Sequence, residues 1–411
     1  MNPIFQAALE IIHILRKVDC PAYFVGGCVR DMLLNLPMKD IDIATVASPA
    51  ILTTMFPKST TVGANFGVVV VRHQNISFEI STFRSDGYYA DGRHPVSIEL
   101  ASMKEDAFRR DFTINGLFYD PENKKVYDYV GGRSDLERKI LRTIGLPRQR
   151  FSEDKLRLIR AVRFAAKLDF TIEDNTKKAI AKAAPSLIPS VSVERIWLEL
   201  KKMNEHPGFT IALSLLHELR LLVAIFPELK QQTTFHIKKS FRALESISSS
   251  KSFPTILLLQ PLFNGLDEET IIKAFRRFKI SNKEFDILKK WCSLKSHLHS
   301  KRTDRIFWTH FFIDVNSDLL LKFALILIPD QKEKSDFLAK IRNLKEELEP
   351  HILRLISQRP LLSAEDLIMQ GVPQGRLLGD LLREAEYLTI EHNYANKDEV
   401  LAKLRAKGFW K

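Results

Sequence analysis

Two aspartates with one residue between them are the side chains of this chain best suited to chemistry. Asp40 and Asp42 lie in "KDIDIAT", a short aliphatic run with the composition of a strand. Because strand side chains alternate between faces, both carboxylates are predicted on one solvent-facing side, with Ile41 and Ile43 on the buried side. Mg²⁺ binds through one or two carboxylates together with substrate phosphates. Asp40 and Asp42 are therefore the predicted metal ligands and catalytic residues, although a solvated strand edge gives the same pattern.

A glycine pair precedes the aspartates. Gly26 and Gly27 follow "AYFV", which has strand composition, and they open the helical run "VRDMLLN". A Gly-Gly turn lets backbone N–H groups approach a phosphate, and the start of a helix adds partial positive charge. Arg30 supplies a cation there, and Asp31 is placed to hold it. The alternative is a plain turn from strand to helix.

The whole run resembles a known motif. GG-x-x-RD, followed nine residues after Asp31 by D-x-D, is similar to the nucleotidyltransferase motif of the class II tRNA nucleotidyltransferase/poly(A) polymerase family. Three later stretches agree with the family: "FRSDGYYADGRHP" (83–95) resembles its flexible loop, "RRDFTINGLFYD" its ribose-contacting motif and "EDKLRLIRAVRF" its nucleobase-selecting motif. The resemblance covers about residues 20 to 200. It implies a DNA polymerase beta-like head that extends RNA 3′ ends without a nucleic-acid template, with Mg²⁺ as cofactor.

The ribose-contacting motif offers groups for a nucleoside triphosphate. Arg110 is a cation directed at phosphate, Asp111 an acceptor and Asn115 an amide that can discriminate a ribose 2′-OH. The alternative is that the arginines are solvated and Asp111 caps a helix. Glu79 faces outward in "SFEIS" if Phe78 faces inward, which makes it either a third acidic group near the metals or an exposed strand residue.

The nucleobase-selecting motif places charges at a spacing of three. Asp154, Arg157, Arg160 and Arg163 lie along one slowly drifting side of a helix, for which Ser152 is the predicted N-cap. Cytosine and adenine both present an amine donor beside a ring-nitrogen acceptor, so Asp154 and Arg157 are predicted to read the base. Arg160 and Arg163 then orient that pair or hold phosphates. A solvated face is the alternative for such a run.

Composition limits the partners and the compartment. Lys and Arg exceed Asp and Glu by 62 to 50, giving a net charge of +12, which favours a polyanion such as RNA. We expect RNA, ATP and CTP as partners, and neither DNA nor a membrane. Three scattered cysteines favour a reducing compartment, and the N-terminal run has the pattern of an amphipathic helix, so the prediction is a cytoplasmic protein.

The elements divide into a mixed first part and a helical remainder. Strand candidates are "AYFVG", "DIDIAT", "FGVVVVRH" and "ISFEISTF", whereas apolar residues recur at three and four after Ser152. The prediction is an α/β nucleotidyltransferase head with a small mixed sheet at about 1–140, then an all-α neck (141–203), body (204–355) and tail (356–411). Clusters of Pro, Gly and Ser mark the boundaries.

The sequence leaves open which nucleotides the enzyme would add, because members of the same family make different products. Two stretches favour CCA addition with CTP and ATP: the loop "YYADGRHP" and the run "VGANFGVVVV". The second is not the arginine-rich version that bacterial poly(A) polymerases of the family show at that place. The high pI and "RAVRFAAKL" favour a poly(A) polymerase, and an enzyme that adds only A is a further alternative. A non-catalytic RNA-binding protein explains the charge but leaves the paired aspartates unexplained.

Overall fold

The computed structural model describes residues 3–61, 67–87, 98–245, 253–300 and 303–408. The chain forms two compact units: the first comprises Met1–Thr234 and Arg277–Ile280, and the second Phe235–Arg276 and Ser281–Lys411. This division does not test the predicted boundaries of head, neck, body and tail, which stay predictions. None of the helices in the described ranges is long and apolar enough to cross a membrane.

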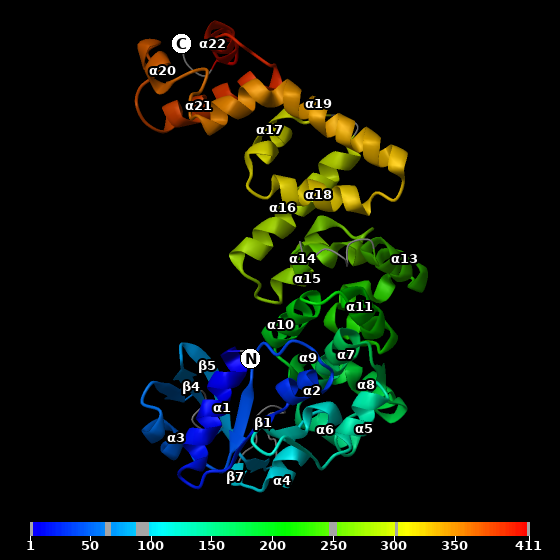
Figure 1. The fold of residues 1–411 in the computed structure, drawn as a ribbon. Coiled ribbons are helices and arrows are strands. Elements are labelled where there is room, and N and C mark those ends of the chain that lie inside the picture. Colours follow the sequence, from blue (N-terminus) through cyan, green and yellow to red (C-terminus); the bar gives the residue numbers. More distant parts are fainter. Residues whose placement is uncertain (1–2, 62–66, 88–97, 246–252, 301–302, 409–411) are drawn as a thin grey trace. The chain divides into compact units, whose positions relative to one another are not determined.

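A seven-stranded sheet forms the beginning of the first unit (Figure 1). Its order is β3-β4-β5-β2-β1-β8-β9, and only β2 and β5 pair in parallel. The strands are β1 (Ala22–Val25), β2 (Asp42–Thr45), β3 (Ser59–Thr61), β4 (Val68–His73), β5 (Ile76–Thr82), β8 (Leu117–Asp120) and β9 (Lys125–Asp128). The predicted mixed sheet and its four predicted strands are confirmed as β1, β2, β4 and β5.

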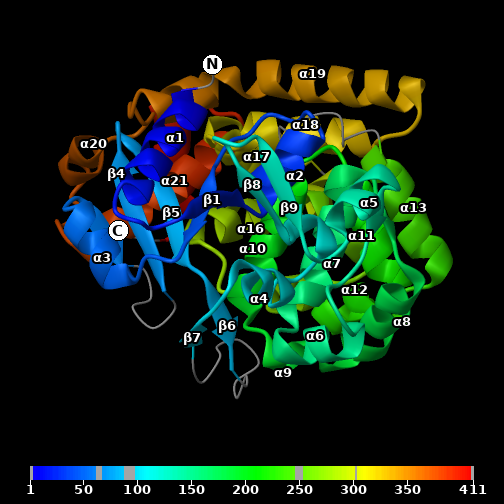
Figure 2. The same cartoon turned by 60° about the horizontal axis from the view of Figure 1, so that its bottom comes forward.

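The two faces of the sheet have different roles. On one face, α1 (Pro3–Arg16) packs against β1 and β5, and α3 (Pro49–Met55) against β3 and β4 (Figure 2). Phe24 and Ile43 are register partners on that face, and both are buried. The other face carries a smaller apolar cluster that includes Val25, whose register partner is Asp42. Because partners in an antiparallel pair point to the same side, Asp42 projects from the less covered face.

Short elements connect the sheet to the helices of the first unit. They are α2 (Gly27–Leu33), β6 (Arg84–Asp86), β7 (Ile98–Leu100), α4 (Met103–Phe108), the 3₁₀-helix η2 (Thr113–Asn115), α5 (Gly132–Glu137) and β10 (Ile140–Leu141). The helical part follows as α6 (Pro147–Glu153), α7 (Leu156–Leu168), β11 (Thr171–Ile172), α8 (Asp174–Ala183), η3 (Ala184–Ser186), α9 (Leu187–Ser190), α10 (Val193–Asn204), α11 (Phe209–Glu218), α12 (Leu221–Ile225) and η4 (Pro227–Gln231). Strands β6 and β7 pair with each other, as do β10 and β11. Helix α7 packs against α10 and α11, so one face of α7 is core and the other is available to the site.

The second unit is helical throughout its described residues, as the sequence predicts. Its elements are α13 (Thr234–Glu245), α14 (Thr255–Leu258), η5 (Gln260–Phe263), α15 (Glu268–Arg276), α16 (Asn282–His299), α17 (Arg305–Ile313), α18 (Ser317–Leu327), α19 (Gln331–Ile356), α20 (Ala364–Met369), α21 (Arg376–Glu391) and α22 (Lys397–Ala406). Leu367, Leu381, Leu388 and Leu404 are among the residues of a separate apolar core at the end of this unit. The predicted fold class, a mixed-sheet head followed by helices, is therefore confirmed.

Candidate active site

The two aspartates lie at the start of strand β2. Asp40 and Asp42 are exposed, while Ile41 and Ile43 are 2% and 0% exposed, so the predicted alternation is confirmed. Strand β2 starts at Asp42, and Asp40 belongs to the loop before it. Glu79 of β5 is also exposed beside a buried Phe78, as predicted. The three side chains make no hydrogen bond or ion pair with the part of the chain that the structure describes.

The carboxylates act on one another electrostatically. Strands β2 and β5 run parallel with Ile43 beside Ile80, so Asp42 is the lateral neighbour of Glu79. The pKa of Asp42 is raised to about 6, first by desolvation and then by the charges of Glu79 and Asp40, while Arg110 acts in the opposite direction. Among the described residues, no group of three or more His, Cys, Asp or Glu side chains is arranged to hold a metal ion. A cation site here therefore rests on the aspartate pair, with Glu79 acting through its charge.

A cavity of about 450 Å³ collects nearly all the predicted site residues. It is lined by Gly26, Gly27, Arg30, Asp42, Arg109, Arg110, Asp111, Asn115, Asp154, Arg157, Arg160, Arg163, Phe164 and Lys167. Asp40, one of the two predicted metal ligands, is outside this lining, and so is Glu79. The sheet thus supplies a carboxylate to the same cavity to which the helices supply arginines.

The glycine turn between β1 and α2 brings backbone close to a guanidinium. Gly26 has φ +75°, a conformation that L side chains rarely adopt. A Cβ at this position would lie 3.2 Å from Nη1 of Arg110. The N–H of Gly26 donates to the carbonyl of Leu117 at 3.1 Å, so it is part of the sheet. The backbone conformation therefore favours glycine, and a larger residue would also crowd Arg110.

Arg30 is buried and begins a hydrogen-bonded chain. Its Nε and Nη2 lie 2.8 and 2.7 Å from Oδ1 of Asp31, which confirms the predicted support. Its Nη1 donates to Oδ1 of Asn115 at 2.6 Å, and Nδ2 of Asn115 donates to Oδ1 of Asp111 at 3.0 Å. The glycine turn and the ribose-contacting motif are thus joined through side chains 85 positions apart.

Asp111 connects these hydrogen bonds to the arginine stripe, which consists of Arg157, Arg160 and Arg163. Its Oδ2 accepts from Nε and Nη2 of Arg160 at 2.9 and 2.6 Å. Burial raises the pKa of Asp111, but Arg160 and the hydrogen bond from Asn115 outweigh it and bring the pKa down to about 2. Asp111 also accepts the N–H of Phe112 at 2.8 Å. The carboxylate is therefore ionised and fully engaged at neutral pH.

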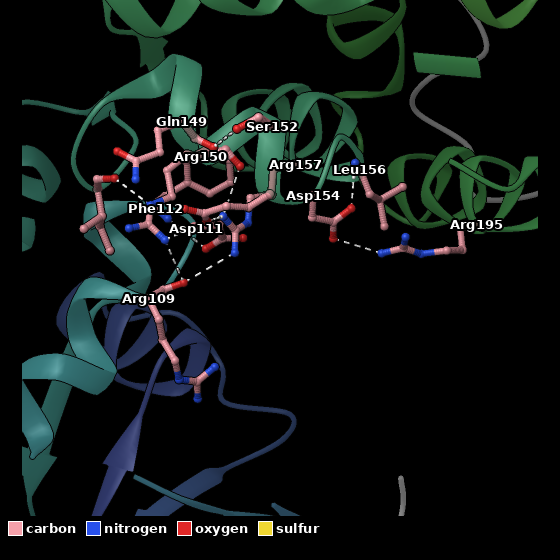
Figure 3. A network of polar contacts seen from close by, with 12 residues as sticks. Arg109, Asp111, Phe112, Gln149, Arg150, Ser152, Asp154, Leu156, Arg157 and Arg195 are labelled. Atoms are coloured by element: carbon pink, nitrogen blue, oxygen red, sulfur yellow. Dashed lines mark hydrogen bonds and ion pairs between the residues drawn. The ribbon is translucent and has the colours of Figure 1, made fainter. Parts of the chain in front are cut away.

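Each arginine of the stripe has its own carboxylate. Arg157 donates to Glu153 at 2.5 Å, Arg160 to Asp111, and Arg163 to Glu199 at 2.6 Å. Figure 3 shows that Arg157 also reaches the backbone carbonyl of Arg109. The guanidinium groups are consequently fixed in direction before any ligand arrives, and the predicted solvated face is excluded as an account of this run.

Asp154 lies before α7, and the prediction that Ser152 caps this helix is wrong. Ser152 is inside α6, because Pro147 starts a separate helix that continues to Glu153. Oδ1 of Asp154 instead accepts the N–H of Leu156 at 2.9 Å, and its Oδ2 accepts from Arg195 at 3.0 Å (Figure 3). Asp154 is thereby held from two sides while it lines the cavity.

Other cavity residues were not predicted. Arg30, Arg160 and Arg163 lie over the ring of Phe164 at 5.1, 5.2 and 4.2 Å, so this ring is the centre of the positive group. Lys167 lines the same cavity, with Nζ 3.8 Å from Oδ2 of Asp31. The three-residue spacing of the arginines does not include Phe164. An aromatic residue in an amphipathic helix normally indicates the core, so the sequence did not point to a site residue here. Residues 88–95 of the predicted flexible loop and 62–66 of "VGANFGVVVV" lie outside the described residues.

Comparisons with known proteins agree along the chain. Residues 22–142 match the model of the poly A polymerase head domain, and 169–233 that of the probable RNA and SrmB- binding site of polymerase A. A CCA-adding enzyme of Geobacillus thermodenitrificans (strain NG80-2) is 46% identical over 222 residues, a match that spans about half of either protein (54% of each). One of Streptococcus sanguinis (strain SK36) is 34% identical over 94% of this chain and 93% of its own. The crystal structure of the Bacillus stearothermophilus CCA-adding enzyme in complex with CTP has a TM-score of 0.75 at 28% identity, covering 99% of this chain and 98% of that one.

Proposed function

Because the chain belongs to the class II tRNA nucleotidyltransferase/poly(A) polymerase family, we propose that it adds the sequence CCA to tRNA 3′ ends, with CTP and ATP as substrates. The observation that carries the proposal is the single cavity in which Asp42 of the sheet meets Asp154 and the arginines of α7. The relatives named above, each a CCA-adding enzyme, support this product over a poly(A) tail or a single added A.

The reaction joins an RNA 3′-hydroxyl to the α-phosphate of the incoming nucleotide. The hydroxyl oxygen forms a new P–O bond, loses its proton and displaces pyrophosphate. Asp40 and Asp42 would hold Mg²⁺, which when bound supplies charge neutralisation at the phosphates and favours ionisation of the attacking hydroxyl. The donor set fits this ion: two exposed carboxylates, one with its pKa raised to about 6, are relieved of their repulsion by a divalent cation.

The triphosphate is held by the cations nearest the glycine turn. Arg110 lies against Gly26 and lines the cavity, and Arg30 lines the same cavity, where it is fixed by Asp31. The N–H groups of arginine match phosphate oxygens in pairs, so these two side chains orient the α-phosphate toward the sheet edge. Asn115 keeps a second N–H on Nδ2 for a ribose hydroxyl, and Asp111, whose oxygens are already engaged, takes part by holding that amide in place.

Base choice is assigned to Asp154 and Arg157. Both oxygens of Asp154 accept one hydrogen bond from protein, and each keeps a second lone pair for the amine of cytosine or adenine. Arg157 is oriented by Glu153 and donates to the ring nitrogen. Arg160 and Arg163 orient this side of the cavity through their own carboxylates and add positive charge for phosphates.

The RNA partner and the compartment follow from bulk properties. A net charge of +12 favours the tRNA backbone, and residues 169–233 match a model of an RNA-binding site. The three cysteines are buried and unpaired, which supports a reducing compartment, and we place the protein in the cytoplasm.

One assay tests the product. Purified protein is incubated with tRNA lacking its 3′ CCA, tRNA ending in CC, and unstructured oligo(A), with CTP and ATP supplied separately and together. The proposal expects CC from CTP alone on the first substrate, a single A on the second, and complete CCA when both nucleotides are present. Extension of oligo(A) by many A residues identifies a poly(A) polymerase instead, and A addition only to tRNA ending in CC identifies an A-only enzyme.

A further inference from the structure

A buried carboxylate lies directly behind the arginines of the cavity. Asp106 of α4 is 0% exposed and is absent from the cavity lining. Its Oδ1 accepts from Nε of Arg109 at 2.8 Å, and its Oδ2 accepts from Nε and Nη2 of Arg110 at 3.1 and 2.8 Å. The backbone N–H of Arg84, at the start of β6, also donates to Oδ1 at 3.4 Å. The spacing of three and four residues from Asp106 to the arginines lets one helical turn make both contacts.

The way Asp106 binds Arg110 decides which side of the guanidinium faces the cavity. Because Nε and Nη2 are both directed at Asp106, Nη1 is the nitrogen that lies against the Gly26 turn. The guanidinium is further confined by the ring of Phe118, 5.4 Å from its central carbon. A flexible arginine is thus held in one rotamer by a carboxylate and an aromatic ring.

We infer that Asp106 is a positioning residue for the nucleotide's phosphates, acting through Arg110 and touching no substrate itself. The inference rests on the proposed function for the identity of the ligand, since the cavity must take a triphosphate. With Asp106 ionised, Arg110 presents Nη1 beside the glycine turn; with an amide there, one of the two acceptor atoms becomes a donor and the guanidinium loses its fixed direction. Binding of phosphates then costs the entropy of ordering Arg110 again.

The test compares Asp106→Asn with Asp135→Asn. Asp135 is a matched control, because it is also a buried carboxylate bound to an arginine (Arg142), but it does not line the cavity. Calorimetric titration measures binding of inorganic tripolyphosphate and of cytidine, and steady-state kinetics measure KM and kcat for CTP. Asp106→Asn is expected to weaken tripolyphosphate binding about tenfold, from the entropy of ordering one long side chain, and to raise KM for CTP with little change in kcat. Cytidine binding by Asp106→Asn is expected to stay near the wild-type value. In the Asp135→Asn protein, tripolyphosphate binding and the KM for CTP stay near wild-type values as well.

A double substitution separates positioning from general damage. Arg110→Lys keeps the charge but loses the paired hydrogen bonds, so adding Asp106→Asn to it is expected to have little further effect on tripolyphosphate affinity. Full additivity, or an Asp106→Asn protein that binds tripolyphosphate as wild type does, overturns the inference. If Asp106→Asn does not fold, Asp106→Glu keeps the charge and displaces it by one methylene, and an unchanged tripolyphosphate affinity in that variant also overturns it. Tripolyphosphate binding needs no RNA, so this result is independent of which product the enzyme makes.

Discussion

Asp40, Asp42 and Glu79, named here the carboxylate edge, differ from the arginines of α7 in how their charges are satisfied. Asp42 of this group lines the same cavity as the arginines. The pKa of Asp42 is raised to about 6, by desolvation first and then by the like charges of Glu79 and Asp40. Across the cavity, Arg157, Arg160 and Arg163 each bind a separate carboxylate. The carboxylates thus lie near groups of like charge, whereas each of these three arginines has an acidic partner.

This difference indicates which side changes when ligands bind. A group of like charges is stabilised by a counterion, so the carboxylate edge gains most from a divalent cation. Paired arginines gain little from a further partner, but they present fixed N–H directions and lose little entropy on binding. We therefore expect substitutions at the edge to affect turnover most, and substitutions on α7 to affect selectivity and stability.

The largest effect is expected at the edge. Asp42→Ala or Asp40→Ala removes a proposed metal ligand from an exposed position, so addition of labelled CMP to tRNA is expected to fall by about 10³-fold or more, since a metal contributes several kcal/mol to the transition state. The temperature of unfolding and the affinity for tRNA are the controls, and both stay near wild type because no core is lost. Near-normal turnover in both variants would exclude the metal assignment.

Asp154→Asn is expected to have the next largest effect, on base choice. The amide places a donor where the amine of cytosine or adenine points, so the preference for CTP and ATP over UTP and GTP falls by about 10- to 100-fold, from roughly 1 to 3 kcal/mol per base contact. Competition between nucleotide pairs in a single-turnover assay measures it. Glu173→Gln, a carboxylate of the same unit outside the cavity lining, is the control. An unchanged preference in Asp154→Asn would exclude Asp154 from base choice.

Asp111→Asn tests the paired side through acid stability. The pKa of Asp111 is lowered to about 2 from an ordinary 3.8, so its contribution is fully present above about pH 4 and is lost as the pH falls toward 2. By linkage this amounts to about 2 kcal/mol, which the asparagine variant lacks. Urea unfolding at several acidic pH values measures it: the wild type loses this stability on acidification, and the variant follows a flatter curve. Parallel curves would show that Asp111 is not held as the structure has it.

The smallest effect concerns the affinity of the edge for Mg²⁺. Asp42 binds a cation only when ionised, so with a pKa of about 6 the half-saturating Mg²⁺ concentration for nucleotide addition is expected to rise about fourfold between pH 7.5 and 5.5. Glu79→Gln removes one of the charges that raise this pKa, so in that variant the rise moves to lower pH. If Glu79→Gln and wild type show the same pH dependence, Glu79 does not influence the ionisation of Asp42.

Local rules account for much of the site. The period of two in a strand predicts that Asp40 and Asp42 share a side, and the Gly-Gly turn and the arginine stripe lie where motif spacing places them. The same rules could have found Asp106, since its distances of three and four residues from Arg109 and Arg110 are those of helix neighbours. Strands β8 and β9 were missed because neither alternates between buried and exposed residues: β8 is buried at three of its four positions, and β9 has no buried residue.

Partners far apart in the sequence could not be predicted this way. Arg163 and Glu199 are 36 positions apart, and Asp154 and Arg195 are 41 apart. Such pairs form only once α7 packs against α10, and nothing in either segment alone specifies the other. The start of α7 was misplaced for a related reason, because Ser152 is a good cap by residue type but lies inside a helix begun by Pro147. Tertiary packing decided both.

The ring of Phe164 makes the three arginines around it dependent on one another. Arg30 comes from the head, and Arg160 and Arg163 from α7, yet all three lie within about 5 Å of this single ring. Replacing any one of them alters the field and the packing felt by the other two. Their contributions to nucleotide affinity are therefore not separable quantities, and an effect measured for one arginine belongs to the group around the ring.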